Sequence, residues 1–416
     1  MSERIVIKEI CEVYDGPHAT PKKTVDGPVY LGIDAITDDG KINAKEFAHL
    51  SEEDYIKWTK RVTPQYGDIV FSYEATLGRY ALIPKDFYGC LGRRLAIIRN
   101  VSKDIDTLWL YYYFLSPEWK QFIQSKIIKG STVNRISVED FPTYTVPNIS
   151  IKVQRKIANI LSKIDEKIAL NNNINDNLEQ QLMLLYDYWF TQFDFPDNDG
   201  NPYQTSDGKM VWNDTLKRNI PENWKVQSII SNCLSSIIKP GVEIFNTKTY
   251  LATGDVKGTS ISTGTIVDCD GRESRANMQP SINSVWFAKM KNSIKHLYLN
   301  KEMQPIISSC ILSTGFCGLQ CNEISFEYIA SYVSNAYFEI HKDMLAHGAT
   351  QEAVNNDDLA GVHIIIPEDT VLRAYHEATQ PIYAQISKNI CENQELVKLR
   401  DWLLPMLMNG QTTISD

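Results

Sequence analysis

The sequence predicts a duplicated α/β (α+β) protein, in which two similar mixed domains are separated by two long antiparallel coiled-coil helices in a pseudo-twofold internal repeat. Three observations predict this fold. The 416-residue chain resembles itself after about half its length, each half begins with alternating strand-like and helical runs, and each half ends in a long helical pattern. The expected parts are a first domain at 1–146, a first long helix at 147–192, a linker at 193–220, a second domain at 221–366 and a second long helix at 367–410.

The composition is that of a soluble globular protein, with 43% hydrophobic and 22% charged residues. The chain has no apolar run of membrane-spanning length and its first residues lack the apolar block of a signal peptide, so we expect a cytoplasmic protein with no membrane contact and mostly reduced cysteines. The net charge of −9 argues against a simple nucleic-acid coat protein. Counted by segment, however, two nearly neutral domain blocks alternate with two acidic helix blocks, so either domain block can still expose a basic face.

The repeat is clearest around a small polar loop. GSTVNRISVEDF, from Gly130 to Phe141, aligns with GATQEAVNNDDL, from Gly348 to Leu359, about half the chain later. Each segment is followed by a short strand-like run that ends in a proline, Pro147 or Pro367, and then by a helical pattern. The two halves are therefore expected to share one scaffold.

Each long helix carries apolar residues at the three-and-four spacing of a coiled-coil seam. Two seam positions of the first helix are the asparagines Asn171 and Asn175, and both recur as Asn389 and Asn393, at the same offset that separates Gly130 from Gly348. Arg400 departs from the seam, with Leu399 beside it as a substitute, and Pro381 predicts a kink or a late start of the second helix. The remaining seam residues expected at the helix interface are Ile157, Leu161, Ile164, Ile168, Leu178, Leu182, Leu185, Ile382, Ile386, Leu396 and Leu403.

Two arrangements of these helices are open: each could lie on its own domain, or the two could pack on each other. A helix over residues 157–192 would be about 54 Å long, and a small α/β domain offers no groove of that length. We therefore favour antiparallel pairing. Asparagines buried in the seam would weaken the pair but fix its register and partner.

No catalytic motif stands out. The chain lacks the phosphate loop, the dinucleotide fingerprint, the His-Glu-x-x-His zinc motif and the Asn/Asp-Pro-Pro-Tyr/Phe tetrapeptide of amino-methyltransferases. Asp197, Asp207 and Lys209 are spaced like the carboxylates and lysine of a metal-dependent nuclease, but they lie in a turn-rich linker without strands to fix them. We therefore expect no catalytic residue and no metal site.

Basic residues interleaved with aromatic and small polar residues suggest contacts to double-stranded DNA, since Lys and Arg neutralise phosphates and Arg, Asn and Gln can read base edges. A solvated surface charge is the alternative for each one. The candidates in the first domain are Lys57, Lys60, Arg61, Tyr73, Arg79, Arg93, Arg94, Lys129, Ser131, Thr132, Asn134 and Arg135, and those in the second are Arg272, Arg275, Asn277, Lys289, Lys291, Thr350 and Gln351.

Over essentially its whole length the chain resembles the specificity subunit of type I restriction-modification enzymes. The resemblance rests on VPNISIKVQRKIANILSKIDEKIALNNNINDN and the rest of the first helix, on the following GNPYQTSDGKMVWN and IPENWKV, on the Gly-Ser-Thr-x-Asn-Arg-Ile loop and on the half-chain repeat. The second copy departs from the family pattern, because Tyr375 and His376 stand where a Gln-x-x-Ile start is usual.

The resemblance implies two target-recognition domains, each reading one half of a bipartite DNA site, with the helices as a spacer that sets the gap. It also implies partners: two methyltransferase subunits that use S-adenosylmethionine to methylate adenine, and restriction subunits that use ATP and Mg²⁺. This chain would hold no cofactor itself. Two other classes are kept as rivals, a free-standing nuclease and a scaffold that joins proteins without reading DNA.

Overall fold

The computed structural model describes residues 3–130 and 133–410 of the chain. These fall into two compact units, Met1–Glu166 with Lys398–Asp416, and Lys167–Val397. Each unit contains one strand-rich domain together with a stretch of two long helices, α4 (Ile151–Tyr186) and α8 (Asp369–Met408). None of the helices in the described part of the chain is both long and apolar enough to cross a bilayer.

The first strand domain (Arg4–Pro147) contains a four-stranded antiparallel sheet of order β2-β8-β5-β6 and a three-stranded sheet of order β4-β3-β7, in which β3 and β7 are parallel. β1 pairs with β9 and closes the domain. Its elements are β1 (Arg4–Val6), β2 (Cys11–Asp15), β3 (Thr24–Leu31), β4 (Ala48–His49), α1 (Glu52–Trp58), β5 (Ile69–Ser72), β6 (Tyr80–Leu82), β7 (Gly89–Leu91), β8 (Leu95–Asn100), α2 (Thr107–Leu115), α3 (Pro117–Lys126) and β9 (Thr145–Pro147).

The second strand domain (Lys225–Ile366) repeats this plan with sheets of order β13-β22-β19-β20 and β17-β14-β21-β18, and β14 and β21 are again parallel. A β10–β11 hairpin precedes it. The elements are β10 (Met210–Asn213), β11 (Arg218–Pro221), β12 (Lys225–Ser228), β13 (Ser235–Ile237), β14 (Thr247–Leu251), β15 (Val256–Lys257), β16 (Ser260–Ile261), β17 (Thr265–Asp268), β18 (Ala276–Met278), β19 (Ser284–Ala288), β20 (His296–Leu299), α5 (Gln304–Ser309), β21 (Cys310–Ser313), β22 (Phe316–Cys321), α6 (Phe326–Ser334), α7 (Ala336–Leu345) and β23 (His363–Ile366).

Local sequence explains where the short helices begin. The carboxylate of Asp106 accepts a hydrogen bond from the backbone N–H of Trp109 at the start of α2, and the hydroxyl of Ser116 accepts one from Trp119 at the start of α3. Pro117 fills the first position of α3, where a missing N–H costs nothing. In the second domain Asn335 caps α7 in the same way.

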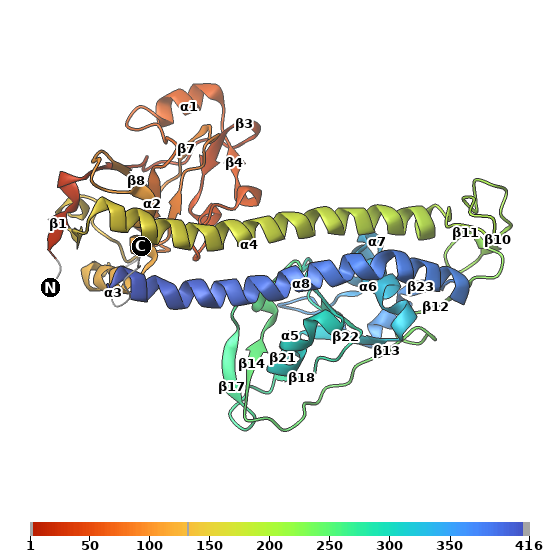
Figure 1. The fold of residues 1–416 in the computed structure, drawn as a ribbon. Helices are drawn as coiled ribbons and strands as arrows, with labels where there is room; N and C mark the ends of the chain where they lie inside the picture. The colour runs from red at the N-terminus through yellow and green to blue at the C-terminus, as the bar shows by residue number, and fades with distance from the viewer. Residues whose placement is uncertain (1–2, 131–132, 411–416) are drawn as a thin grey trace. The chain divides into compact units, whose positions relative to one another are not determined.

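The two long helices run antiparallel, side by side, in Figure 1, and side-chain contacts within each unit join them. α8 runs through Pro381 without interruption from Asp369, so the expected late start is wrong. Pro381 is tolerated because it lies on an exposed face of the helix. Together the repeated sheets and the paired helices confirm the predicted fold class.

The seam residues are placed as a coiled coil requires. Ile157, Leu161, Ile164, Ile168, Leu182 and Ile386 are buried, and Leu178, Leu185, Ile382, Leu396 and Leu403 are partly buried. In the first unit, Ile157 and Leu161 of α4 share a core cluster with Leu404 and Leu407 of α8. In the second unit Leu182 of α4 and Ile386 of α8 share another.

α4 ends in a π-helical turn, Asp187–Thr191, that directs large aromatic side chains into the second domain. The ring of Phe190 lies 4.6 Å from that of Tyr328 and 4.9 Å from that of Tyr375, measured between centroids. Such edge-on and tilted contacts stabilise beyond the buried area alone. This cluster anchors α4 and α8 to α6.

Candidate nucleic-acid interface

Three segments of the first strand domain meet at one edge, which we call the first edge. The backbone N–H of Tyr73, just after β5, donates to the carbonyl of Arg94 at 3.1 Å, and the N–H of Ile136 donates to the carbonyl of Tyr73 at 2.8 Å. The turn between β7 and β8, the end of β5 and the loop after α3 are therefore held together by backbone hydrogen bonds rather than by flexible side chains.

The loop after α3 is closed at its neck. Ile128 and Arg135 exchange both backbone hydrogen bonds, at 2.9 and 3.1 Å, and Arg135 also forms a bridge with Glu74. Lys129, Asn134 and Arg135 are exposed on this loop. The candidates Ser131 and Thr132 lie outside the described residues.

The turn between β7 and β8 presents two arginines. Arg94 is half-buried, with its Nε 3.5 Å from Glu74 Oε1, and has a φ of 72°, a left-handed conformation that is uncommon for residues other than glycine. Arg93 is exposed, and its guanidinium makes no hydrogen bond or ion pair with the residues the structure describes. Because no carboxylate of the described residues neutralises Arg93, it is available to an anionic ligand.

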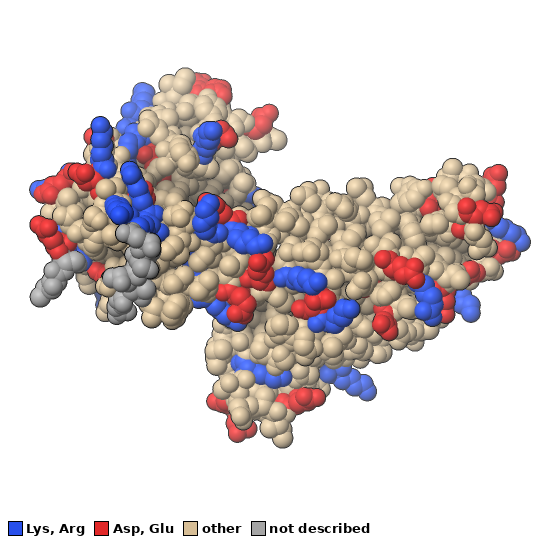
Figure 2. Space-filling view, viewed as in Figure 1, with Lys and Arg blue, Asp and Glu red and all other residues tan. Residues whose placement is uncertain are grey.

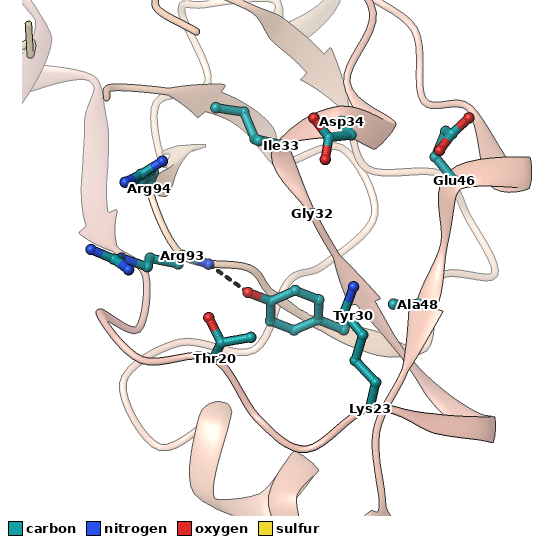
Figure 3. Close-up of a pocket in the computed structure, with 10 residues that line it drawn as sticks. All are labelled: Thr20, Lys23, Tyr30, Gly32, Ile33, Asp34, Glu46, Ala48, Arg93 and Arg94. Atoms are coloured by element: carbon teal, nitrogen blue, oxygen red, sulfur yellow. Dashed lines mark hydrogen bonds between the residues drawn. The ribbon is translucent and has the colours of Figure 1, made fainter. Parts of the chain in front are cut away.

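A polar cavity of about 370 Å³ adjoins this turn (Figure 3). Arg93 and Arg94 line one side of it, and the carboxylates of Asp34 and Glu46 line another. Tyr30, from β3, lies between them and accepts a hydrogen bond from the backbone N–H of Arg93 at 3.1 Å. The cavity therefore offers strong donors and strong acceptors at once, as the edge of a base pair requires.

Four polar residues that line this cavity were not among the sequence candidates: Thr20, Lys23, Asp34 and Glu46. They come from the segment before β3, from β3's exit and from the turn before β4. In the sequence they look like ordinary surface residues. No local pattern marks them, because only the parallel pairing of β3 with β7 brings them to Arg93.

Two predicted residues of the first domain are engaged elsewhere. Arg79 places its Nε 2.6 Å from Asp38 Oδ1, and Lys57 places its Nζ 2.8 Å from Glu53 Oε1 on the same helix. Both groups would have to leave a carboxylate before contacting DNA. They are therefore weaker candidates than Arg93 and Arg135.

The other three first-domain candidates differ in exposure. Lys60 is exposed, and Arg61 is exposed with its guanidinium 3.7 Å from Asp15 Oδ2. Tyr73 is only 6% exposed and packs in the core, where burial and the neighbouring Asp15 raise the pKa of its hydroxyl. The side chain of Tyr73 therefore supports the edge from beneath.

The second strand domain builds an equivalent second edge. The N–H of Lys289, just after β19, donates to the carbonyl of Gly315 at 2.9 Å, and the N–H of Val354 donates to the carbonyl of Lys289 at 3.0 Å. These are the same two bonds that join Tyr73 to Arg94 and Ile136. The repeat thus extends to the details of the backbone at both edges.

The loop of the second edge has the same closed neck, because His347 and Ala353 exchange backbone hydrogen bonds and Met290 bridges Ala353. Thr350 and Gln351 are exposed at its tip. Lys291 places its Nζ 2.7 Å from Glu352 Oε2. The candidates Thr350, Gln351, Lys289 and Lys291 therefore gather at one place.

The remaining candidates come from the loop before β18 and from β18 itself. Arg275 is exposed, and its carbonyl accepts from the N–H of Thr314 at 2.8 Å, which joins it to the second edge. Arg272 instead bends back onto its own loop and donates to the carbonyls of Cys269 and Ala276. Asn277 is half-buried, and its backbone carbonyl accepts a hydrogen bond from the N–H of Gly241.

The two edges have the same backbone but different side chains. Where the first edge has Arg93-Arg94, the second has Thr314-Gly315. In Figure 2 several Lys and Arg side chains gather on the visible face of the first strand domain, whereas acidic and basic side chains alternate over the helices. Each domain thus presents its own chemistry on a common scaffold.

The asparagines of the seam are paired across the helices. Asn389 Nδ2 donates to Asn175 Oδ1 at 2.7 Å, and Asn171 Nδ2 donates to Asn393 Oδ1 at 2.9 Å. Asn171, Asn175 and Asn389 are buried. These four amides form a polar layer inside the second unit's part of the coiled coil.

Arg400 also has a partner across the seam, in the first unit. Its Nη1 lies 3.0 Å from Asp165 Oδ1, and the hydroxyl of Tyr112 on α2 donates to Asp165 Oδ2 at 2.7 Å. The expected substitution of Arg400 by Leu399 is wrong, because Leu399 is 43% exposed. The guanidinium keeps its seam position because two carboxylates neutralise it, Asp165 of the opposite helix and the neighbouring Asp401, which is also 3.0 Å away.

Comparison with known proteins shows what the chain is similar to. Residues 2–180 match the family model of the type I restriction modification DNA specificity domain. The chain is 23% identical over 382 residues to the MjaIX specificity subunit of Methanocaldococcus jannaschii, covering 88% of this chain and 82% of that protein. It is 22% identical over 402 residues to the HindI specificity subunit of Haemophilus influenzae, covering 83% and 86%.

A solved structure has the same fold. The S subunit of a type I restriction-modification system from M. genitalium aligns with a TM-score of 0.50 at 13% identity, covering 99% of this chain and 96% of that one. The family model, the curated relatives and this fold agree with one another and with the duplicated architecture. Residues 2–180 thus carry the type I restriction modification DNA specificity domain, and the chain as a whole is similar to the specificity subunits of type I restriction enzymes.

Proposed function

We propose that this chain reads a bipartite site in double-stranded DNA, with one strand domain on each half-site and the α4–α8 pair as the spacer that sets the gap. The observation that carries the proposal is the pair of edges. The same backbone hydrogen bonds hold Tyr73 and Lys289, yet the exposed side chains around them differ. One scaffold with two sets of polar side chains suits two different half-sites.

At the first edge, the residues proposed to contact DNA are Arg93, Lys129, Asn134 and Arg135, which are exposed and lie on segments fixed by the backbone. Arg93 and Arg94 can donate to guanine, and Asp34 in the adjoining cavity can accept from the amino group of cytosine. At the second edge, Arg275, Lys289, Thr350 and Gln351 take the corresponding roles.

The partners follow from the same proposal. The chain would direct two methyltransferase subunits to adenines beside the half-sites and restriction subunits to the same DNA. S-adenosylmethionine, ATP and Mg²⁺ would be bound by those partners. The acidic balance of the helix segments is compatible with partner subunits that supply part of the positive surface around DNA.

The proposal is tested by assembling the chain with its methyltransferase partner and mapping methylated adenines across a genome. We expect a single split motif with a fixed gap. Replacing residues 1–146 by those of a relative should change one half of the motif only. A change in both halves, or methylation without a motif, would refute the assignment of one half-site to each domain.

A point substitution tests the first edge. Arg93→Ala in the assembled complex should cost about 1–3 kcal/mol in binding and relax the specificity of one half-site if Arg93 reads a base. If Arg93 holds a phosphate instead, affinity should fall uniformly and the salt slope should shrink by about one. Arg79→Ala, which removes an arginine already paired with Asp38, is the matched control and should change binding less.

A further inference from the structure

Each strand domain joins the helix pair through a three-residue junction. In the first junction, Tyr112 of α2 donates to Asp165 of α4, and Asp165 pairs with Arg400 of α8. The side chains of Asp165 and Arg400 are 20% and 14% exposed. The first junction is therefore charged and largely shielded from water.

The second junction occupies equivalent positions but is neutral. By the repeat offset, Tyr383 of α8 holds the position that Asp165 holds in α4. By the same offset, Leu182 of α4 holds the position that Arg400 holds in α8. Ser331, which corresponds to Tyr112 when the N-caps of α3 and α7 are aligned, lies with its Oγ 2.9 Å from the hydroxyl of Tyr383. Leu182 is buried beside them and, like both, lines a small cavity.

The rest of the seam is nearly self-complementary. Asn389 is the repeat counterpart of Asn171, so α4 packed against α4 of a second copy would still bring Asn175 against Asn171. Apolar seam residues would likewise meet apolar residues. At the ends Trp189 would replace Leu407, an exchange between apolar side chains that a core can partly absorb.

The Asp165–Arg400 ion pair, in contrast, cannot exchange its partner for the repeat counterpart. In a pair of two α4 helices, each Asp165 would face Leu182 of the other copy instead of Arg400. Because the pair is symmetric, this unfavourable contact would occur twice. A carboxylate placed against an apolar side chain without a cation is strongly unfavourable. The seam thus distinguishes the correct partner helix at this position.

We propose that the Asp165–Arg400 pair is a partner-selection device, which makes α4 accept α8 of its own chain and reject α4 of a second copy. Without it, the duplicated sequence would allow two chains to exchange helices and form a dimer in which identical halves face each other. This inference concerns chain pairing and does not depend on which DNA sequence is read.

The experiment uses the full chain with a protease site inserted between Asp199 and Gly200, in the exposed linker turn. Two preparations carry different tags on their N-terminal ends. They are nicked, mixed, unfolded briefly in guanidinium and refolded, and the capture of one N-terminal half by the other is measured. Nicking removes the covalent connection, so the halves choose their partners by noncovalent contacts alone: the seam and the packing of Phe193 and Phe195 on Trp224. The packing on Trp224 is the same in every variant, so differences between variants report on the seam.

Wild-type halves should show almost no capture of one N-terminal half by the other. The neutral variant Asp165→Leu with Arg400→Leu should raise that capture on the order of 10-fold or more. The exchanged variant Asp165→Arg with Arg400→Asp is the matched control, because it keeps both charges and should stay as selective as the wild type. It also carries Asp401→Asn, because Asp401 pairs with Arg400 at 3.0 Å and would repel a carboxylate at position 400. Equal capture by wild-type and neutral chains overturns the proposal.

A second measurement keeps the proposal testable if the neutral variant folds poorly. Nicked wild type and the nicked exchanged variant are refolded together, and the halves of each mixed pair are counted. N-terminal halves that carry the Asp165→Arg substitution are expected to avoid wild-type C-terminal halves, whose Arg400 repels the new cation, so mixed pairs should be rare. Mixed pairs at the statistical proportion would show that the ion pair selects nothing.

Discussion

The buried amide layer of the helix pair yields a sharp prediction about stability. Asn175 and Asn389 are 6% and 4% exposed, and one side-chain hydrogen bond of 2.7 Å joins them. Asn175→Leu alone removes the acceptor and leaves the Asn389 amide without it, at a cost of about 1–3 kcal/mol. The apolar area that the new leucine buries returns about 1.5–3 kcal/mol, so the two terms roughly cancel and the single variant should be close to neutral.

The double variant Asn175→Leu with Asn389→Leu behaves differently because no buried amide is left unpaired; the Gln385 amide, which donates to Asn389 Oδ1, is exposed and can turn to water. Two leucines bury apolar surface against each other, and after the lost hydrogen bond and some crowding we expect a gain of about 1–3 kcal/mol. The coupling between the two substitutions should therefore be positive and of a similar size. The coupling arises because each substitution removes the unpaired amide that the other substitution alone would leave.

The four chains of this cycle are compared by scanning calorimetry and by guanidinium denaturation. Asn173→Leu, on an exposed position of α4, is the matched control and should change stability by no more than about 0.5 kcal/mol. A double variant less stable than both single variants would refute the reasoning. Since buried amides fix register, the methylation map of the double variant should also show a looser gap between half-sites.

Two further predictions concern the second domain. Burial opposes ionisation of Glu339, but hydrogen bonds and the charge of Lys342 hold its pKa below the ordinary 4.5. The ionised carboxylate therefore stabilises the fold fully above pH 4.5, and this stabilisation is lost as the pH falls through the lowered pKa of the folded state. Glu339→Gln should therefore lower stability near pH 7 by about 1–3 kcal/mol, because among the described residues the buried Lys342 keeps only Asp343, 3.6 Å away, as a carboxylate partner. The substitution should also flatten the acid side of the Tm–pH curve, and an unchanged curve would contradict this. Gly318→Ala would place a methyl group 2.5 Å from the ring of Trp286 and should cost about 1–3 kcal/mol by thermal melting, whereas Gly254→Ala, with open space around it, should cost much less.

Much of the fold could be predicted because the relevant signals are periodic and repeated. The three-and-four spacing from Ile157 onward marks a helix with one apolar face, and its recurrence in the second half of the chain identifies a partner of matching design. Asn171 and Asn175 could be assigned to the seam because their counterparts recur at the same phase. Periodicity is local, so it can be read without knowing the tertiary structure.

The candidate site was only partly predictable. The basic turn at Arg93 and Arg94 and the loop at Arg135 could be read as charged or polar clusters, but so could Arg79, which is paired with Asp38. Whether a cation is available or already neutralised depends on a residue that is distant in the sequence. The residues of the cavity beside Arg93 had no sequence signal for the same reason.

By itself, the sequence determined the duplication, the long helical seam and the absence of familiar catalytic motifs. Only the tertiary structure decided that Asn175 pairs with Asn389, that Arg400 is held by Asp165 rather than replaced by Leu399, and that three separate segments meet beneath Arg93. The physical reason is that periodic burial is encoded by spacing along one chain segment. Hydrogen bonds and ion pairs need two groups within about 3 Å, and their sequence separation is set by the fold.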